Sequence, residues 1–414
     1  MKLLNSEKLN MKIPKYEKVI NAFIPSKIYI PLYDSSLGIK IGGKIKEGDV
    51  VSSYLGVNIH SSIPGKLCEV KNVTMPSGKN EKVAVVNMQG AFSFEGKKTI
   101  KSEWILFQST QILNLLEQNG VHNTFFDYEK ISYQKNDENS SVILGVRLFD
   151  YDPSCVTDSF LFENFYEKIF EGAFIVGKAI GAEKVDFFFS KEQKNIVEKL
   201  KNHQDYQEFN YDFVLATQKK YSFGTKEELN HLLQKKNEKV SYFVDSTTCL
   251  DAFEAVALCK PVMDTFVQVS GSLLGEEKFF KVKKGTLIKN LIEECGLCKS
   301  EPYKVVINGL LRGVSISTSD TPITDYVKSI TVLSAKETAE QKQRACIRCG
   351  DCFRVCPVEI KPEKIFSMYH YNTDISPEIK KMAEKCTQCG RCNTVCPSRI
   401  PLFQTISLLT RNEK

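Results

Sequence analysis

Residues 346–357 read Cys-Ile-Arg-Cys-Gly-Asp-Cys-Phe-Arg-Val-Cys-Pro, and residues 386–397 read Cys-Thr-Gln-Cys-Gly-Arg-Cys-Asn-Thr-Val-Cys-Pro. Both stretches have the spacing C-x2-C-x2-C-x3-C-P, which is typical of ferredoxins that hold two [4Fe–4S] clusters. Three thiolates at this spacing can surround one cluster from a tight turn, where Gly350 or Gly390 lets the backbone bend. The fourth cysteine begins the next segment, too far round to close the same site, and therefore serves the other cluster.

The spacing thus predicts two [4Fe–4S] clusters that exchange their fourth ligand. The first cluster takes Cys346, Cys349, Cys352 and Cys396, and the second takes Cys386, Cys389, Cys392 and Cys356. Disulfides are the weaker interpretation because they need an oxidising compartment, and structural zinc needs only four thiolates, usually arranged in pairs. Two closely coupled clusters indicate a one-electron relay rather than substrate chemistry.

The composition indicates a soluble globular chain of several domains. Of 414 residues, 42% are apolar and 26% are charged, which excludes a disordered or fibrous protein. The net charge of +6 is too small for a nucleic-acid footprint, so we expect no nucleic acid as partner. Charged residues already at Glu7 and Lys8 speak against a signal peptide, and no run of about eighteen apolar residues predicts a membrane span. We expect a cytoplasmic chain with no transmembrane segment of its own.

Residues 1–100 alternate short apolar runs with glycine and proline turns, which predicts a small β domain. The stretches 44–51 (KIKEGDVV) and 59–67 (IHSSIPGKL) resemble the barrel-sandwich hybrid fold of biotinyl and lipoyl carriers. A carrier lysine needs characteristic flanking residues, which Lys66 lacks, so a docking role is the preferred interpretation. His60 is interpreted as a turn residue rather than a ligand.

Residues 101–265 change to an alternation of strands and helices. Buried strands are predicted at 141–146, 185–189 and 213–216, and helices near 158–180, 191–200 and 225–235. Such alternation is typical of a doubly wound, Rossmann-like parallel sheet. A phosphate site in this sheet would need glycines that open a helix, but residues 115–126 contain only Gly120 and carry the acidic Glu117.

The remaining chain predicts two smaller domains. Residues 266–335 read as strand, short helix and two further strands, a β-grasp-like module, and 335–344 as a linker. In the last domain, 336–414, twenty-nine residues separate Cys356 from Cys386, which is too many for a minimal ferredoxin. Helices are predicted to begin at Pro362 and Pro377, so we expect an α-helical ferredoxin. Leu402, Ile406, Leu408 and Leu409 form an apolar helical stripe that is interpreted as core.

In this order, the whole chain resembles RnfC, the cytoplasmic peripheral subunit of the ion-translocating Rnf electron-transport complex. Besides the cysteines, the resemblance rests on residues 143–158, 220–229, 251–271 and 282–296. It implies a barrel-sandwich hybrid start, a Rossmann-like flavin domain related to the NADH-binding subunit of respiratory complex I, a β-grasp module of the SLBB type, and a two-cluster helical ferredoxin. It also implies the other subunits of a membrane-bound Rnf-type complex as partners, and a peripheral location on the inner face of the cell membrane.

The chain departs from this family at the nucleotide site. FMN-binding and NADH-binding relatives carry a glycine-rich loop where this chain has residues 118–128 (QNGVHNTFFDY), and bulky side chains there would occupy the space of the phosphate. The acidic loop also differs at 147–149, which leaves open whether Asp150, Asp152 and Asp158 contact flavin or nicotinamide. FMN and NADH are therefore not expected as cofactors.

Three functions remain open from the sequence. The preferred one is an electron-transfer subunit that passes single electrons through its two clusters, tuned by burial and by hydrogen bonds to sulfur. A flavoenzyme would instead take a hydride from NADH and split the electron pair into the clusters. A scaffold would use a degenerate flavin domain only to dock its neighbours.

Overall fold

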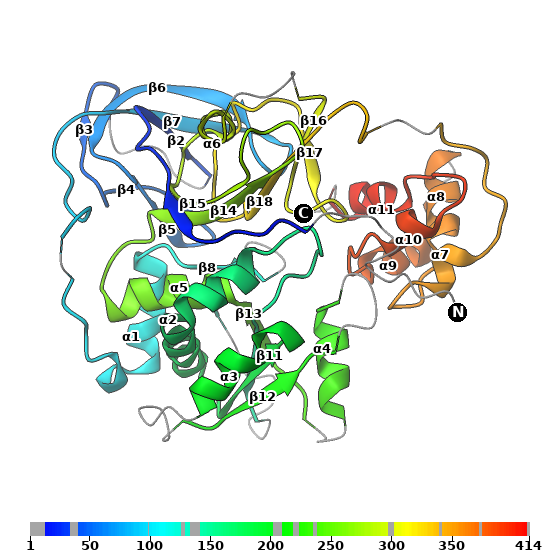
Figure 1. The fold of residues 1–414 in the computed structure, drawn as a ribbon, viewed down its shortest axis with the longest axis horizontal. Coiled ribbons are helices and arrows are strands. Elements are labelled where there is room, and N and C mark those ends of the chain that lie inside the picture. Colours follow the sequence, from blue (N-terminus) through cyan, green and yellow to red (C-terminus); the bar gives the residue numbers. More distant parts are fainter. Residues whose placement is uncertain are drawn as a thin grey trace.

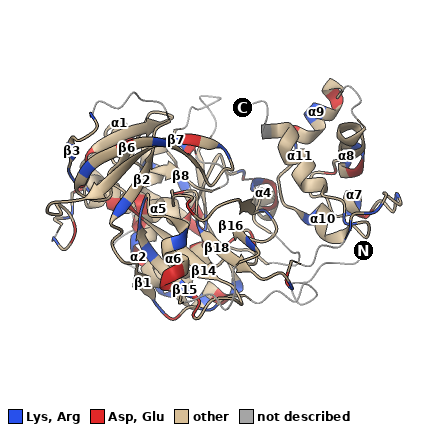
Figure 2. Cartoon of the chain, turned by 90° about the horizontal axis from the view of Figure 1, so that it is seen from above, with Lys and Arg blue, Asp and Glu red and all other residues tan. Residues whose placement is uncertain are grey.

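The computed structural model describes residues 13–33, 40–97, 99–125, 129–132, 141–201, 209–217, 223–234, 238–296, 302–338, 342–371 and 375–411. Within these ranges the chain is a mixed α/β protein whose C-terminal end is a separate group of short helices. Figure 1 shows these helices, coloured orange to red, to one side of a larger body that contains the described sheets. In the second view, helix α4 (Lys226–Leu233) lies between the two parts (Figure 2).

The N-terminal β region consists of antiparallel hairpins. Its sheet has the order β2-β7-β6-β3, and β4 pairs with β5 beside it. The strands are β2 (Lys27–Pro31), β3 (Lys44–Ile45), β4 (Val50–Tyr54), β5 (Val57–His60), β6 (Gly65–Thr74) and β7 (Asn80–Met88). At Gly65 an added Cβ atom would lie 2.1 Å from the carbonyl oxygen of Asn87, so glycine is needed where β6 approaches β7. His60 ends β5, and its ring nitrogens lie 2.8 Å from the carbonyl oxygens of Gly48 and Gln118.

A six-stranded mixed sheet combines residues 264–333 with one strand from the N-terminal region. Its order is β1-β15-β14-β18-β16-β17, and helix α6 (Ile288–Glu294) follows β15 in the chain. The strands are β1 (Val19–Asn21), β14 (Asp264–Ser270), β15 (Lys278–Lys283), β16 (Lys304–Ile307), β17 (Val314–Ile316) and β18 (Ser329–Leu333). Val19 pairs in parallel with Phe279, so backbone hydrogen bonds join the first 100 residues to this sheet. The boundaries 1–100 and 266–335 do not capture this link.

The middle region contains a wholly parallel four-stranded sheet with the order β12-β11-β10-β13. The strands are β10 (Ile143–Arg147), β11 (Lys184–Phe189), β12 (Tyr211–Leu215) and β13 (Tyr242–Asp245), and they alternate with helices α2 (Thr157–Ile180), α3 (Lys194–Lys201) and α4. In chain order this is 3-2-1-4, the arrangement of a doubly wound sheet whose strand order reverses between β10 and β13. Arg147 and Asp245, the last residues of these two strands, are register partners at that reversal.

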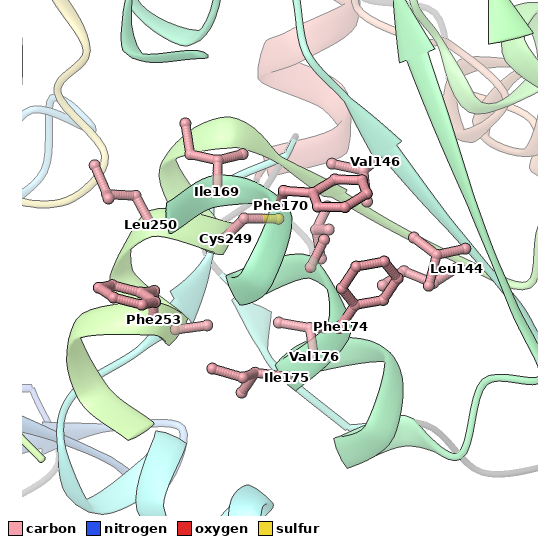
Figure 3. Close-up of a cluster of buried hydrophobic side chains, with 14 of the residues drawn as sticks. Leu144, Val146, Ile169, Phe170, Phe174, Ile175, Val176, Cys249, Leu250 and Phe253 are labelled. Atoms are coloured by element: carbon pink, nitrogen blue, oxygen red, sulfur yellow. The ribbon is translucent and has the colours of Figure 1, made fainter. Parts of the chain in front are cut away.

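Helix α2 forms the centre of the largest core. It packs against helix α5 (Ser246–Ala252), and Figure 3 shows Phe170, Phe174 and Cys249 among the apolar side chains between these helices and β10. An added Cβ atom at Gly172 would lie 1.9 Å from the carbonyl oxygen of Cys249, so this glycine sets the close approach of α2 and α5. Helix α1 (Ser109–Gln118) and the short pair β8 (His122–Asn123) and β9 (Glu129–Lys130) complete the region. No described helix combines the length and the apolar composition that a membrane span needs.

The C-terminal domain is helical. Its helices are α7 (Asp351–Arg354), α8 (Pro362–His370), α9 (Pro377–Glu384), α10 (Arg391–Val395) and α11 (Leu402–Arg411). Proline occupies the first turn of α8 and of α9, where its missing N–H would have no intrahelical partner in any case. Leu402 and Ile406 of α11 are buried in the core of this domain. Leu408 is 48% exposed, so its assignment to the core was wrong: it lies on the solvent side of α11.

Candidate iron–sulfur centres

The four thiols predicted for the first cluster lie around one cavity. Cys346, Cys349, Cys352 and Cys396 all line a space of about 350 Å³. Among the described residues, no three cysteine, histidine or acidic side chains converge tightly enough to hold a single metal ion. The sequence did not single out Glu363, which also lines this cavity and accepts a hydrogen bond from Cys352 Sγ at 3.2 Å. The only sequence signal for Glu363 is its place beside Pro362 in the first turn of α8.

The four thiols predicted for the second cluster act on one another electrostatically. Burial raises the pKa of Cys386 to about 12, and Cys389 and Cys356 raise it further. Burial also raises the pKa of Cys392, with added contributions from Cys389, Cys386, Cys356 and then Cys352, so the two sets of thiols adjoin. Iron is bound by thiolates, so cluster assembly has to displace protons from these buried groups.

The backbone of the two motifs is the same at equivalent positions. Arg348 and Gln388, each two residues after the first cysteine of its motif, have positive φ angles of 54° and 53°. Each donates its backbone N–H to that cysteine's sulfur at 3.4 Å. Gly350 and Gly390 have φ angles of 74° and 68°, a conformation that suits glycine. Such N–H donors stabilise negative charge on sulfur and tune the potential of a bound cluster.

The segments after the fourth cysteines also match. Glu359 and Arg399, three residues after Cys356 and Cys396, both have φ angles of 54°. The N–H of Ile400 points at Cys396 Sγ at 3.5 Å. In the other motif, burial raises the pKa of Cys356 while backbone N–H groups nearby oppose the rise. The domain therefore has an internal twofold repeat in the sequence and in the backbone.

The second set of thiols faces the larger body of the protein. An added Cβ atom at Gly390 would lie 2.7 Å from the carbonyl oxygen of Leu311. The next residue, Arg391, is buried and forms an ion pair with Glu228 of α4 at 2.5 Å. The sequence carried no signal for this pairing, because the two residues lie 163 positions apart. The ion pair fixes the second motif against the α/β region.

The nucleotide crevice expected at the strand reversal is filled by the chain's own side chains. Arg147 is buried, and its guanidinium lies over the ring of Phe125 at 4.3 Å. It donates hydrogen bonds to the carbonyl oxygens of Gly224 at 3.1 Å and Phe125 at 3.2 Å. Ligands of doubly wound sheets bind at this reversal, outside the carboxyl ends of the strands. Arg147 takes that place here.

The loop that replaces the glycine-rich segment turns its side chains inward. Asn123 donates to the carbonyl oxygen of Phe243 at 2.8 Å, and the hydroxyl of Thr124 donates to the carboxylate of Asp245 at 3.0 Å. His122 is buried. Residues 126–128 lie outside the described residues. A flavin phosphate needs backbone N–H groups at an open loop, and these residues do not fit it.

The three acids of the altered loop hold the structure together. Asp150 accepts hydrogen bonds from the backbone of Asp158 and Ser159 at the start of α2. Asp152 accepts one from the N–H of Leu311 at 2.8 Å, which ties the loop to the six-stranded sheet. Asp158 pairs with Lys328 at 2.8 Å. Their described partners are therefore all within the chain.

Comparison with known proteins defines the class first. Residues 342–400 match the family model of the 4Fe-4S dicluster domain. The match confirms the predicted [4Fe–4S] cofactors and gives the helical domain its class, a dicluster ferredoxin domain.

The similarity to full-length relatives then identifies the larger protein type. The chain is 24% identical to the subunit designated C in the proton-translocating ferredoxin:NAD(+) oxidoreductase complex of Clostridium ljungdahlii, covering 83% of this chain and 78% of that protein. It is 22% identical to the subunit of the same letter in the Na(+)-translocating ferredoxin:NAD(+) oxidoreductase complex of Acetobacterium woodii, covering 85% of each. The resemblance to RnfC over most of the chain is confirmed.

Two other similarities are more limited. The corresponding subunit of the ion-translocating oxidoreductase complex of Haemophilus influenzae is 22% identical, and the match covers 82% of this chain but 43% of that longer protein. The NAD+-reducing [NiFe]-hydrogenase, in the crystal structure of its air-oxidised state, superposes with a TM-score of 0.45 at 12% identity, covering 74% of this chain and 61% of the hydrogenase chain.

Proposed function

We propose that this chain is the RnfC-like iron–sulfur subunit of a membrane-bound, ion-translocating oxidoreductase complex, and that it relays single electrons through two [4Fe–4S] clusters. The observation that carries the proposal is the gathering of Cys346, Cys349, Cys352 and Cys396 around one cavity, beside a second set of adjoining thiols. Each cluster supplies one-electron chemistry when bound. The chain's own residues hold the thiolates, exclude water from the second set and direct N–H donors at sulfur.

The finer architecture is part of the same proposal. The β region would be a barrel-sandwich hybrid, the parallel sheet a Rossmann-like domain, and residues 266–335 an SLBB-type β-grasp module. The order 3-2-1-4 of the parallel strands supports the second of these assignments. The other subunits of the complex would hold the chain at the inner face of the cell membrane as a peripheral protein.

An anaerobic reductive titration tests the relay. The purified protein is expected to take up two electrons per chain, one into each cluster, and to show low-temperature EPR signals of two interacting [4Fe–4S]⁺ centres. The expectation follows from the adjoining thiol sets, because Cys352 of the first set acts on the pKa of Cys392 of the second. Zinc in place of iron, or a chain that accepts no electrons from dithionite, would refute the proposed function.

A flavoenzyme that takes hydride from NADH is the second candidate, and the filled crevice disfavours it. We expect protein incubated anaerobically with excess FMN to release all of it on desalting, because Arg147 and Phe125 occupy the switch point. Added NADH is expected to bleach no flavin band. The measurement is flavin fluorescence of the desalted, denatured protein against a known flavoprotein treated in parallel. Retention of one FMN per chain would overturn this part and favour the flavoenzyme.

A further inference from the structure

A cationic groove lies beside the first set of thiols. It encloses about 1000 Å³ and is lined by Lys342, Arg344, Thr394, Val395, Cys396, Pro397 and Arg399. All three charged residues of the lining are cations, and all three are exposed. Cys396 is the predicted fourth ligand of the first cluster, so the groove ends at the edge of that cluster. A molecule in the groove would approach the cluster closely while meeting only positive charge from the lining.

The backbone of the groove is held in place from both sides. The N–H of Arg344 donates to the carbonyl oxygen of Ser398 at 2.9 Å, and the hydroxyl of Ser398 donates to the carbonyl oxygen of Ala345 at 2.8 Å. The N–H of Arg399 donates to the carbonyl oxygen of Cys396 at 3.2 Å. These bonds join the segment before the first motif to the segment after the second. The cations are therefore presented from a fixed backbone.

The two sets of thiols differ in what they face. Cys346 and Cys349 are exposed, and Ile347 between them is 67% exposed. The second motif instead packs against the body of the protein through Gly390 and through Arg391. An external redox partner can thus approach the first cluster more closely than the second. An exposed apolar residue beside a charged groove suits the small, transient interfaces of electron-transfer complexes.

We propose that this groove docks a small acidic redox protein or redox domain, which exchanges one electron with the first cluster. The inference rests on the proposed function, because it assigns a partner to the same relay. In the step, the partner's reduced centre loses one electron and the oxidised first cluster gains it, with no bond or proton transferred. Opposite charges on groove and partner steer the encounter and raise its rate, and dissolved salt screens this attraction.

A protein fits the groove better than a lipid surface does. Anionic headgroups also attract lysine and arginine, but a bilayer surface is broad and cannot enter a groove whose lining includes the thiol residue Cys396. A protruding acidic loop of a folded protein can enter it. The structure therefore favours a protein partner, and vesicle binding becomes one outcome of the test.

The test uses the full chain with both clusters and a reduced, acidic plant-type [2Fe–2S] ferredoxin as the probe. Stopped-flow absorbance under anaerobic conditions gives the second-order rate constant of cluster reduction. The groove variant is Lys342→Glu with Arg344→Glu and Arg399→Glu. The matched control reverses three exposed lysines on and before α3, Lys191→Glu with Lys194→Glu and Lys199→Glu. Each set lowers the formal net charge from +6 to 0, so only the position of the charge differs.

The groove variant is expected to slow the reaction by about tenfold or more and to remove most of its salt dependence, whereas the control stays close to wild type. Dithionite should reduce all three proteins to the same extent, which separates this result from a failure of the relay itself. Neutral replacement of the same three cations by glutamine should give an intermediate rate. Equal rates in groove variant and control would overturn the proposal. Loss of binding to phosphatidylglycerol vesicles with an unchanged ferredoxin rate would also overturn it, in favour of a membrane contact.

Discussion

Replacing Cys349 by serine is expected to remove or convert the first cluster and leave the second in place. Cys349 lies on the cavity with the three other thiols of its set, and a [4Fe–4S] cluster needs all four ligands. The iron content should fall towards half of the wild-type value, and the EPR spectrum of the reduced protein should lose the interaction between two centres. Iron analysis and low-temperature EPR on anaerobically purified protein give both readouts.

The matched control is Cys68→Ser, at a half-buried cysteine of β6 outside both motifs. It should keep the full iron content. The fold of the larger body should survive in both variants, because that body has its own cores, and circular dichroism checks this point. Unchanged iron and an unchanged EPR spectrum in Cys349→Ser would defeat the ligand assignment.

Replacing Lys328 by methionine is expected to destabilise the body by about 3–5 kcal/mol, because it leaves buried carboxylates without their cation. Lys328 lies 2.8 Å from Asp158 and 2.6 Å from Asp245. Burial alone would lower the pKa of Lys328, but these two carboxylates raise it above its usual value. Urea unfolding of the α/β region, followed by hydrogen exchange of α2 and β13, measures the loss.

The destabilisation should depend on pH in a defined direction. Burial raises the pKa of Asp158 to about 6, against the lowering effect of Lys328. Without the lysine this folded-state pKa rises further, so the cost is full at pH values above it. The cost shrinks as the pH falls through the folded pKa, because the protonated acid needs no cation. Lys304→Met, at an exposed lysine of β16, should change stability by less than about 0.5 kcal/mol. A pH-independent loss in Lys328→Met would indicate packing instead of charge.

Local patterns predicted the individual elements well. The apolar run at 185–189 is the strand Lys184–Phe189, and the helix predicted near 158–180 is Thr157–Ile180. Both are buried elements whose pattern is complete within the segment itself. The pairing of Val19 with Phe279 could not be predicted in this way, because strand partners far apart in sequence leave no local signal.

The same distinction applies to the site. The eight cysteines could be found from sequence because their spacing encodes the turn that gathers them. The ion pair of Arg391 with Glu228 could not, since the two residues come from separate domains. The altered loop at 118–128 indicated the loss of a phosphate cradle, but the residue that fills the crevice, Arg147, emerged only from the strand order.

The repeated backbone of the helical domain has a consequence for its origin. Arg348 and Gln388 share one unusual conformation, and Glu359 and Arg399 share another, although their side chains differ. On the proposed assignment each half contributes three sulfurs to one cluster and a single sulfur to the other, so one half alone completes neither. Two identical halves could complete both by pairing, and the present domain therefore has the architecture expected of a fused homodimer.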